Sequence, residues 1–114
     1  MRAVLCASAL VALALPVAAQ SFDGVYRPKG SSWDCTSIGS DGGALAIRDG
    51  VFYGVESACT LTKPTPVNGM SAMLYDAECN GEGESYGFRV MFMALGDGLA
   101  MIQDGAVSEL ERCD

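Results

Sequence analysis

The sequence predicts a small all-β protein, in which an antiparallel meander of about seven short strands closes into a barrel; a two-sheet sandwich is the alternative. Three observations lead to this fold class. Short apolar runs alternate with Asx-Gly pairs, which favour tight turns because both residues tolerate positive φ. No window sustains a helical period with a cap and a stop. Closure into a barrel is favoured because it removes exposed strand edges.

The chain begins with the features of a secretory signal peptide. Arg2 precedes an apolar run over residues 3–15, in which Ser8 is the one polar residue, and small residues precede an expected cleavage site before Gln20. A transmembrane span needs about 20 apolar residues, and polar residues arrive here too soon. We therefore expect residues 1–19 to be removed. Residues 20–114 then remain as a single domain in the periplasm or outside the cell.

The mature domain is expected to be acidic. The chain has seven Lys and Arg against fourteen Asp and Glu, and loss of Arg2 leaves a net charge of 6 − 14 = −8. This charge argues against nucleic acid and anionic membranes as partners and favours a basic protein. A domain of 114 − 19 = 95 residues buries roughly 60–65% of its unfolded surface, so covalent reinforcement is expected.

The apolar runs between the turns are the expected strands. The central hairpin joins the fourth and fifth of them. In its second arm, residues 88–95 are apolar on both alternating faces apart from Arg89, which predicts a strand covered on both sides. The last run contains a stretch, Val107–Arg112, that is also compatible with one helical turn. In order, the runs are Phe22–Tyr26, Ala44–Arg48, Val51–Leu61, Ser71–Cys79, Tyr86–Leu95, Leu99–Gln103 and Ala106–Cys113.

Four cysteines remain once Cys6 has left with the leader, and an even number in an exported chain predicts two disulfides. Zinc is disfavoured, because the separations of 24, 20 and 34 residues contain no Cys-x-x-Cys pair and the chain has no histidine. A turn at Asn68-Gly69 with one bulged residue brings Cys59 opposite Cys79 and leaves Cys35 with Cys113. A repeated Asp-Gly pattern instead favours Cys35 with Cys59 and Cys79 with Cys113, which ranks second.

No pattern of catalytic or metal-ligating residues is found. Asp76 and Glu78 open a run that resembles a calcium loop, but Gly87 stands where the closing carboxylate belongs. The five methionines of the mature chain lie among Phe, Val and Leu, as core residues do. Without histidine there is no base to activate Ser or Cys. We expect no cofactor, no metal and no enzymatic activity.

The candidate binding residues are acidic and aromatic. Glu78, Glu82 and Glu84 lie around the central turn, and Trp33 lies in a polar Gly-Ser-Ser-Trp-Asp segment, where an aromatic side chain is suited to anchor a partner. The sequence therefore favours a non-catalytic binding or inhibitor module directed at a basic secreted protein. The alternative is a structural or stress-accessory protein of the cell envelope.

A resemblance supports a compact exported domain. The matching residues resemble a pattern in small four-cysteine secreted bacterial proteins of unassigned function, and a weaker likeness is to the periplasmic lysozyme inhibitors. The first resemblance implies a β domain and no activity; the second implies a disulfide-closed barrel that inhibits a basic lytic enzyme. The residues that carry the pattern are Gly24-Val25-Tyr26, Cys35, Glu56-Ser57-Ala58-Cys59, Cys79-Asn80-Gly81-Glu82-Gly83-Glu84 and Arg112-Cys113.

Overall fold

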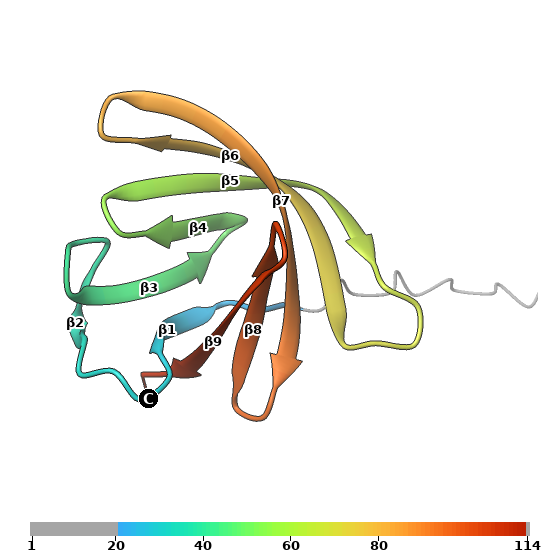
Figure 1. Ribbon diagram of the computed structural model, residues 1–114, viewed down its shortest axis with the longest axis horizontal. Helices are drawn as coiled ribbons and strands as arrows, with labels where there is room; N and C mark the ends of the chain where they lie inside the picture. The colour runs from blue at the N-terminus through green and yellow to red at the C-terminus, as the bar shows by residue number, and fades with distance from the viewer. Residues whose placement is uncertain (1–20, 114) are drawn as a thin grey trace, which may run out of the picture.

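The computed structural model describes residues 21–113, which form nine β-strands and no helix (Figure 1). Most neighbouring strands are joined by short turns. The strands are β1 (Gly24–Pro28), β2 (Asp34–Ile38), β3 (Gly43–Arg48), β4 (Val51–Gly54), β5 (Ser57–Pro66), β6 (Ala72–Gly81), β7 (Glu84–Leu95), β8 (Gly98–Gln103) and β9 (Ala106–Arg112).

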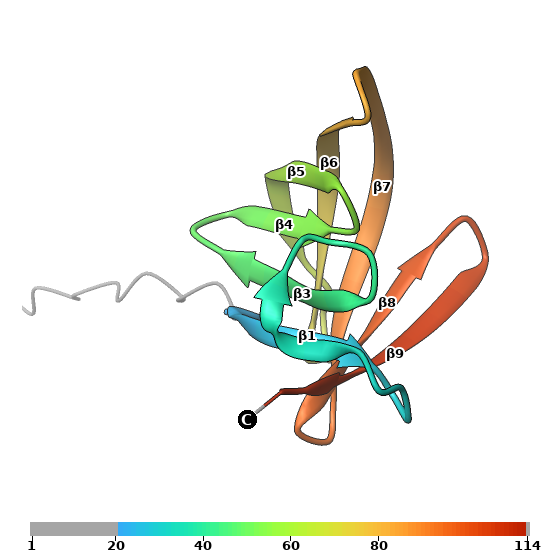
Figure 2. The same cartoon turned by 90° about the vertical axis from the view of Figure 1, so that its left-hand side faces the viewer.

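Eight of these strands form a closed antiparallel barrel. Their order is β1-β9-β8-β7-β6-β5-β4-β3, and β3 pairs in turn with β1, with Val25 opposite Ala46, which closes the ring. β2 lies parallel to β3 as a ninth strand outside the ring (Figure 2). The predicted meander and barrel are confirmed, and the two-sheet sandwich is excluded.

Two hairpin turns follow the Asx-Gly rule and two are displaced; of the latter, the β7–β8 turn falls on Gly96-Asp97 rather than on Asp97-Gly98, because Leu95 pairs with Gly98. Asp49-Gly50 and Asp104-Gly105 have positive φ at both residues, as type I′ hairpin turns require. Between β6 and β7 the turn falls on Glu82-Gly83, with φ of 50° and 80°, rather than on Asn80-Gly81. The pair Asn80-Gly81 instead extends β6, so this hairpin is two residues longer than the sequence pattern indicates.

Nine strands replace the expected seven for two reasons. The run Val51–Leu61 is divided by a turn at Val55-Glu56, where Glu56 has a φ of 49°. β2 has no apolar face for a sequence pattern to detect, because its side chains are polar or cysteine apart from Ile38. The stretch Val107–Arg112 belongs to strand β9 and forms no helical turn.

Phe92 of β7 is at the centre of the core. Its side chain is 1% exposed, and its ring lies 5.8 to 6.0 Å from the rings of Phe22, Phe52 and Tyr75. Burial of these rings contributes most to the stability of a core this small. One end of the barrel is closed by Phe22 and Tyr26, where the Tyr26 hydroxyl donates a hydrogen bond of 2.6 Å to the Phe22 carbonyl.

β7 is covered on one face, not on both as its sequence indicates. Val90 and Phe92 point inward and are buried, whereas Met91 and Met93 point outward and stay partly exposed. The outward methionines lie beside other apolar side chains of the neighbouring strands, with Leu74 and Ile102 directly opposite Met91. The continuous apolar run of β7 therefore reflects an outer barrel surface that is partly apolar, and not a second buried layer.

The two disulfides confirm the preferred pairing. Cys59 and Cys79 are direct cross-strand neighbours of β5 and β6, and both are buried. Their register depends on a bulge between Thr62 and Thr65, where Lys63 has a φ of 51°. The expected bulge is present, but the β5–β6 connection begins after Pro66 and is longer than a two-residue turn.

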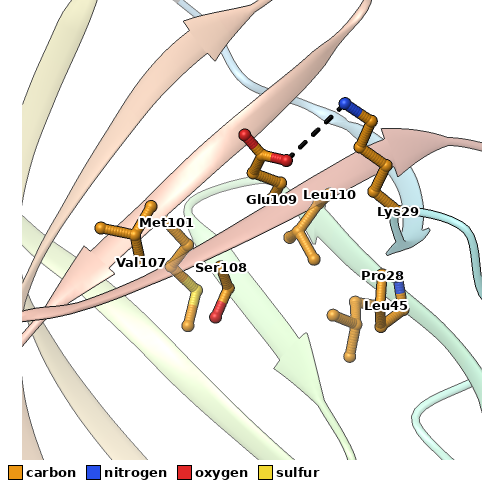
Figure 3. A pocket seen from close by; sticks show the side chains of 8 residues that line it. All are labelled: Pro28, Lys29, Leu45, Met101, Val107, Ser108, Glu109 and Leu110. Carbon is orange, nitrogen blue, oxygen red and sulfur yellow. Dashed lines mark ion pairs between the residues drawn. The ribbon is translucent and has the colours of Figure 1, made fainter.

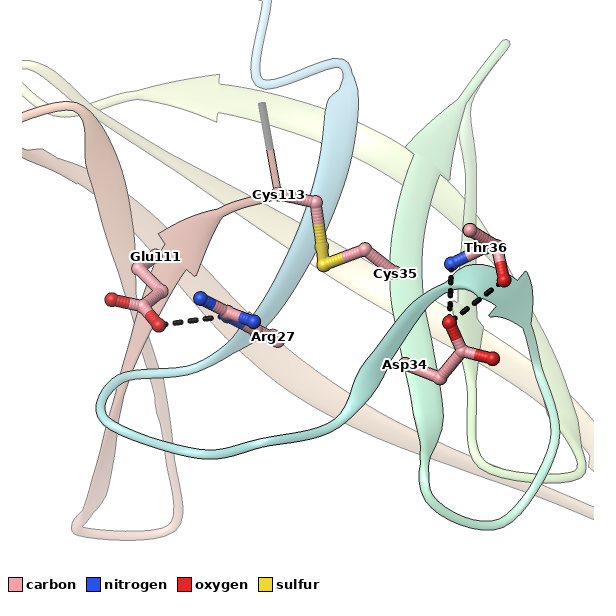
Figure 4. Close-up of a disulfide and its surroundings, with 6 residues drawn as sticks. All are labelled: Arg27, Asp34, Cys35, Thr36, Glu111 and Cys113. Carbon is pink, nitrogen blue, oxygen red and sulfur yellow. Dashed lines mark hydrogen bonds and ion pairs between the residues drawn. A yellow bond between two sulfur atoms is a disulfide. The ribbon is translucent and has the colours of Figure 1, made fainter.

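The second disulfide joins β2 to the end of the chain, between Cys35 and Cys113 (Figure 4). Beside it, Arg27 Nε lies 2.8 Å from Glu111 Oε1 and links β1 to β9. The Thr36 backbone N–H and hydroxyl both donate to the Asp34 carboxylate, which lowers the pKa of Asp34. The disulfide therefore attaches β2, which lies outside the ring, to the C-terminal end of the chain.

The expected signal peptide, residues 1–19 with Cys6, lies outside the described residues. Residues 21–113 contain no helix long and apolar enough to cross a membrane. The two disulfides are consistent with an oxidising compartment outside the cytoplasm.

Candidate functional site

An open groove of about 510 Å³ lies at one end of the barrel, and we call it the mouth groove. The turns that follow β4, β6 and β8 all lie toward this end, because strands alternate in direction around an antiparallel meander. The opposite end is the one closed by Phe22 and Tyr26. The mouth groove is lined by Leu45, Phe52, Gly54, Val55, Ser57, Cys59, Tyr86, Gly87, Phe88, Met101, Gln103 and Asp104.

Two stacked aromatic rings form one wall of the mouth groove. Tyr86 and Phe88 alternate on the inward face of β7, and their rings lie 6.5 Å apart with an interplanar angle of 17°. Phe88 packs against the core, whereas Tyr86 is 47% exposed. An aromatic ring held in place by a buried neighbour offers contact area at a small cost in side-chain entropy.

The mouth groove exists because β8 leaves β7 halfway along its length. β8 pairs with Met91–Leu95, and the β8–β9 hairpin then diverges from the barrel (Figure 2). The remaining half of β7, from Glu84 to Val90, pairs with β6 alone. Of the inward side chains of this half, Val90 is buried and Phe88 packs against the core, whereas Tyr86 is left exposed at the mouth groove.

Carboxylates lie at or beside the turns at this end of the barrel, and we call Glu56, Glu82, Glu84 and Asp104 the acidic rim; Asp104 lines the mouth groove itself. Glu84 is on the same face of β7 as Tyr86, by strand alternation. No member of the acidic rim belongs to an ion pair within residues 21–113; the ion pairs there involve other acids. The negative charge at this end is therefore not compensated by the protein's own cations.

Two carboxylates of the acidic rim contact each other. The hydrogen bond with Glu82 and the charge of Glu82 raise the pKa of Glu56, and Asp41 adds a smaller repulsion. The turns hold these groups together, since Glu56 and Glu82 both have left-handed backbone conformations. A cation placed here would relieve the repulsion between them.

A second hollow, of about 670 Å³, lies against β9 and the end of β1 (Figure 3). Leu45 and Met101 line both this hollow and the mouth groove. Its charged residues are already paired, with Lys29 Nζ 3.7 Å from Glu109 Oε2. It therefore offers an incoming basic partner less unsatisfied charge than the mouth groove does.

The four residues that the sequence suggests for binding do not form one site. Glu82 and Glu84 lie together on the acidic rim. Glu78 is exposed on the opposite face of the hairpin, because β6 directs Cys79 inward and Glu78 outward. Trp33 is half-buried against the core, in the β1–β2 connection, which lies far from the β6–β7 turn in both views (Figures 1 and 2).

Sequence reasoning missed the aromatic wall and Glu56. The alternation Glu84-x-Tyr86-x-Phe88 after a turn is the signal that three side chains share one face. No comparable signal exists for Glu56, because the contact between Glu56 and Glu82 joins two turns that are far apart in the sequence.

Acidic side chains can also act as ligands of a metal ion. Residues 21–113 contain no group of three or more His, Cys, Asp or Glu side chains arranged to hold a metal ion. Asp76, the first residue of the calcium-like run, lies 3.5 Å from Lys63 and 3.9 Å from Arg89, so cations of the protein already neutralise it.

Comparison of the chain with known protein families, with curated proteins and with solved structures found no match.

Proposed function

We propose that this protein is an exported, non-catalytic binding or inhibitor module that receives a basic secreted protein at the mouth groove. The observation that carries the proposal is an open apolar groove, with an exposed tyrosine on its wall, inside an acidic rim that has no internal counter-charges. Apolar contact supplies affinity and the acids supply steering and orientation. A basic cell-wall lytic enzyme, such as a lysozyme, is the first candidate partner, and the periplasm or the cell exterior is the place of action.

The experiment is a calorimetric titration against basic lysozymes at about 0.15 M salt, where the screening length is roughly 8 Å. Lytic activity is followed in the same samples. Charge attraction alone would fade at this salt, whereas a specific complex retains its affinity. We expect saturable binding and reduced lysis.

The variants separate the site from net charge. Glu82→Gln with Glu84→Gln removes two charges from the acidic rim. Asp49→Asn with Asp97→Asn removes two charges from turns at the opposite end of the barrel, and Asn tolerates the positive φ of Asp49. The first pair should weaken binding by about tenfold, at roughly 1 kcal/mol or less for each exposed charge, and the second pair should have little effect.

Equal effects of the two pairs would contradict the proposed site. Absence of both binding and inhibition at this salt would favour the alternative function, a structural or stress-accessory protein of the envelope.

A further inference from the structure

Half of strand β7 has a free edge. β6 pairs with β7 without interruption from Ala72–Met93 to Gly81–Glu84, but β8 pairs only with Met91–Leu95. Among residues 21–113, no strand lies alongside Glu84–Val90 on the side that faces β8. A strand edge of this kind presents unpaired N–H and C=O groups.

The register identifies the unpaired groups. The Ala94 N–H donates to the Ser71 carbonyl of the β6 side at 2.8 Å, so even-numbered residues of β7 direct their backbone groups toward β6. Because the β6–β7 register has no shift, Ser85, Gly87 and Arg89 direct theirs toward the free edge. Alternate residues of an added strand would meet these three donors and three acceptors.

From Ser85 to Val90 the edge has no proline, no bulge and no inward-pointing charge, so this part of it is open to pairing. Natural edges are commonly blocked by proline, by a bulge or by an inward-pointing charge. Here the middle residue of the free edge is Gly87, which is exposed and has no side chain, and glycine within a strand often marks the close approach of another backbone. The β8–β9 hairpin diverges from β7 (Figure 2), and Gly87 lines the open mouth groove.

The two faces of the edge define the chemistry of the added strand. On the inner face, its side chains would enter the mouth groove beside Tyr86 and Phe88, which favours apolar residues. On the outer face, Glu78 lies directly across from Gly87 and is exposed without an ion-pair partner among the described residues. Since Gly87 has no side chain, a lysine of the added strand can extend over it to Glu78.

We propose that the free edge of β7 accepts an extended segment of the partner as an additional antiparallel or parallel strand, with apolar residues alternating with basic ones. This inference rests on the proposed function, because it assigns the binding mode of the same basic partner. Backbone hydrogen bonds would give affinity, and the alternating side chains would give specificity.

The test uses amide hydrogen exchange measured by NMR, with a blocked seven-residue peptide of alternating lysine and valine as the probe. In the protein alone, the amides of Ser85, Gly87 and Arg89 should exchange fast, and those of Tyr86 and Phe88 slowly. Saturation with the peptide should slow exchange of the first three by about tenfold or more, because each becomes hydrogen-bonded.

Modified probes and variants provide matched controls. N-methylation of the valines and N-methylation of the lysines block opposite edges of the peptide, so one isomer should lose binding by about tenfold or more while the other retains it. Gly87→Pro removes an N–H of the free edge and should have a similar effect. Glu78→Gln should weaken peptide binding by several-fold, and less at high salt. The peptide isomers keep the test valid even if Gly87→Pro disturbs folding.

The proposal is overturned if the peptide does not bind at millimolar concentration, if it binds without protecting the three amides, or if both N-methylated isomers bind equally. Protection that increases with protein concentration alone would also overturn it, because a second copy would then occupy the edge. Lysozyme binding without protection of these amides would refute this binding mode and leave the proposed function standing. Peptide protection without lysozyme binding would refute the proposed partner and leave the edge site standing.

Discussion

Replacement of Phe92 by alanine tests the assignment of the two faces of β7, with Met91→Ala as the matched control. The two residues are neighbours in one strand, but Phe92 points into the barrel and is 1% exposed, whereas Met91 is on the outer face and partly exposed. The sequence alone indicates a strand covered on both faces. The structure therefore predicts different costs for two substitutions that the sequence treats alike.

The magnitudes follow from the contacts. Truncation of a buried phenylalanine costs about 3–5 kcal/mol. Phe92 also contacts three other rings, at 5.8, 5.9 and 6.0 Å, so we expect a loss near the upper end, about 4–5 kcal/mol. Met91 is partly exposed on the outer face and buries less apolar surface than Phe92, so its truncation should cost about 1 kcal/mol.

Urea unfolding with both disulfides intact measures the two costs. A domain of this size is expected to have an unfolding free energy of about 5–14 kcal/mol, so the Phe92 variant should unfold at a much lower urea concentration with a similar slope. If Met91→Ala destabilises the protein as much as Phe92→Ala does, the assignment of inner and outer faces is wrong.

Three further outcomes are expected. Non-reducing peptide mapping should recover Cys59 with Cys79 and Cys35 with Cys113, and recovery of another pairing would contradict the barrel register. Replacement of each cysteine pair by serine should lower the unfolding free energy by at most about 3 kcal/mol for the loop of 20 residues and about 4.5 kcal/mol for the loop of 78 residues. The raised pKa of Glu56 means that its contribution to stability is fully present below the ordinary value of 4.5 and is lost as the pH rises through the higher folded-state pKa. In urea unfolding, Glu56→Gln should therefore be more stable than the parent at pH 7. If the difference in unfolding free energy between variant and parent is the same at pH 4, this cause is contradicted. The intact mass of the exported protein should correspond to a chain that begins at Gln20. A mass that corresponds to a chain still containing Cys6 would refute removal of the leader.

Local signals predicted much of the fold. The turns at Asp49-Gly50 and Asp104-Gly105 were readable because Asx and Gly tolerate positive φ, and the cysteine pairing followed from a hairpin register. The β6–β7 turn lies within the expected connection, residues 80–85, but its position at Glu82-Gly83 was not readable, because Glu82 adopts a left-handed conformation that its residue type does not favour. β2 was missed because its position depends on pairing with β3 rather than on an apolar face of its own.

The candidate site was only partly predictable, because it depends on where strands separate. The sequence identifies Glu82 and Glu84 as a charged turn, but it contains no information on the point at which β8 leaves β7. That divergence exposes Tyr86 and creates the mouth groove. Trp33 was an attractive anchor by residue type, but it packs against the core, which covers part of its side chain.

The most direct test of the central claim is to map a bound basic partner onto the surface by NMR. Unlabelled lysozyme is added to isotope-labelled protein at about 0.15 M salt, and the backbone resonances are followed. We expect the largest changes at Val55, Glu56, Tyr86 and Phe88, around the mouth groove, and small changes at the turns after β3 and β7. Changes concentrated at those distant turns, or spread evenly over the acidic surface, would contradict the claim that the mouth groove is the binding site.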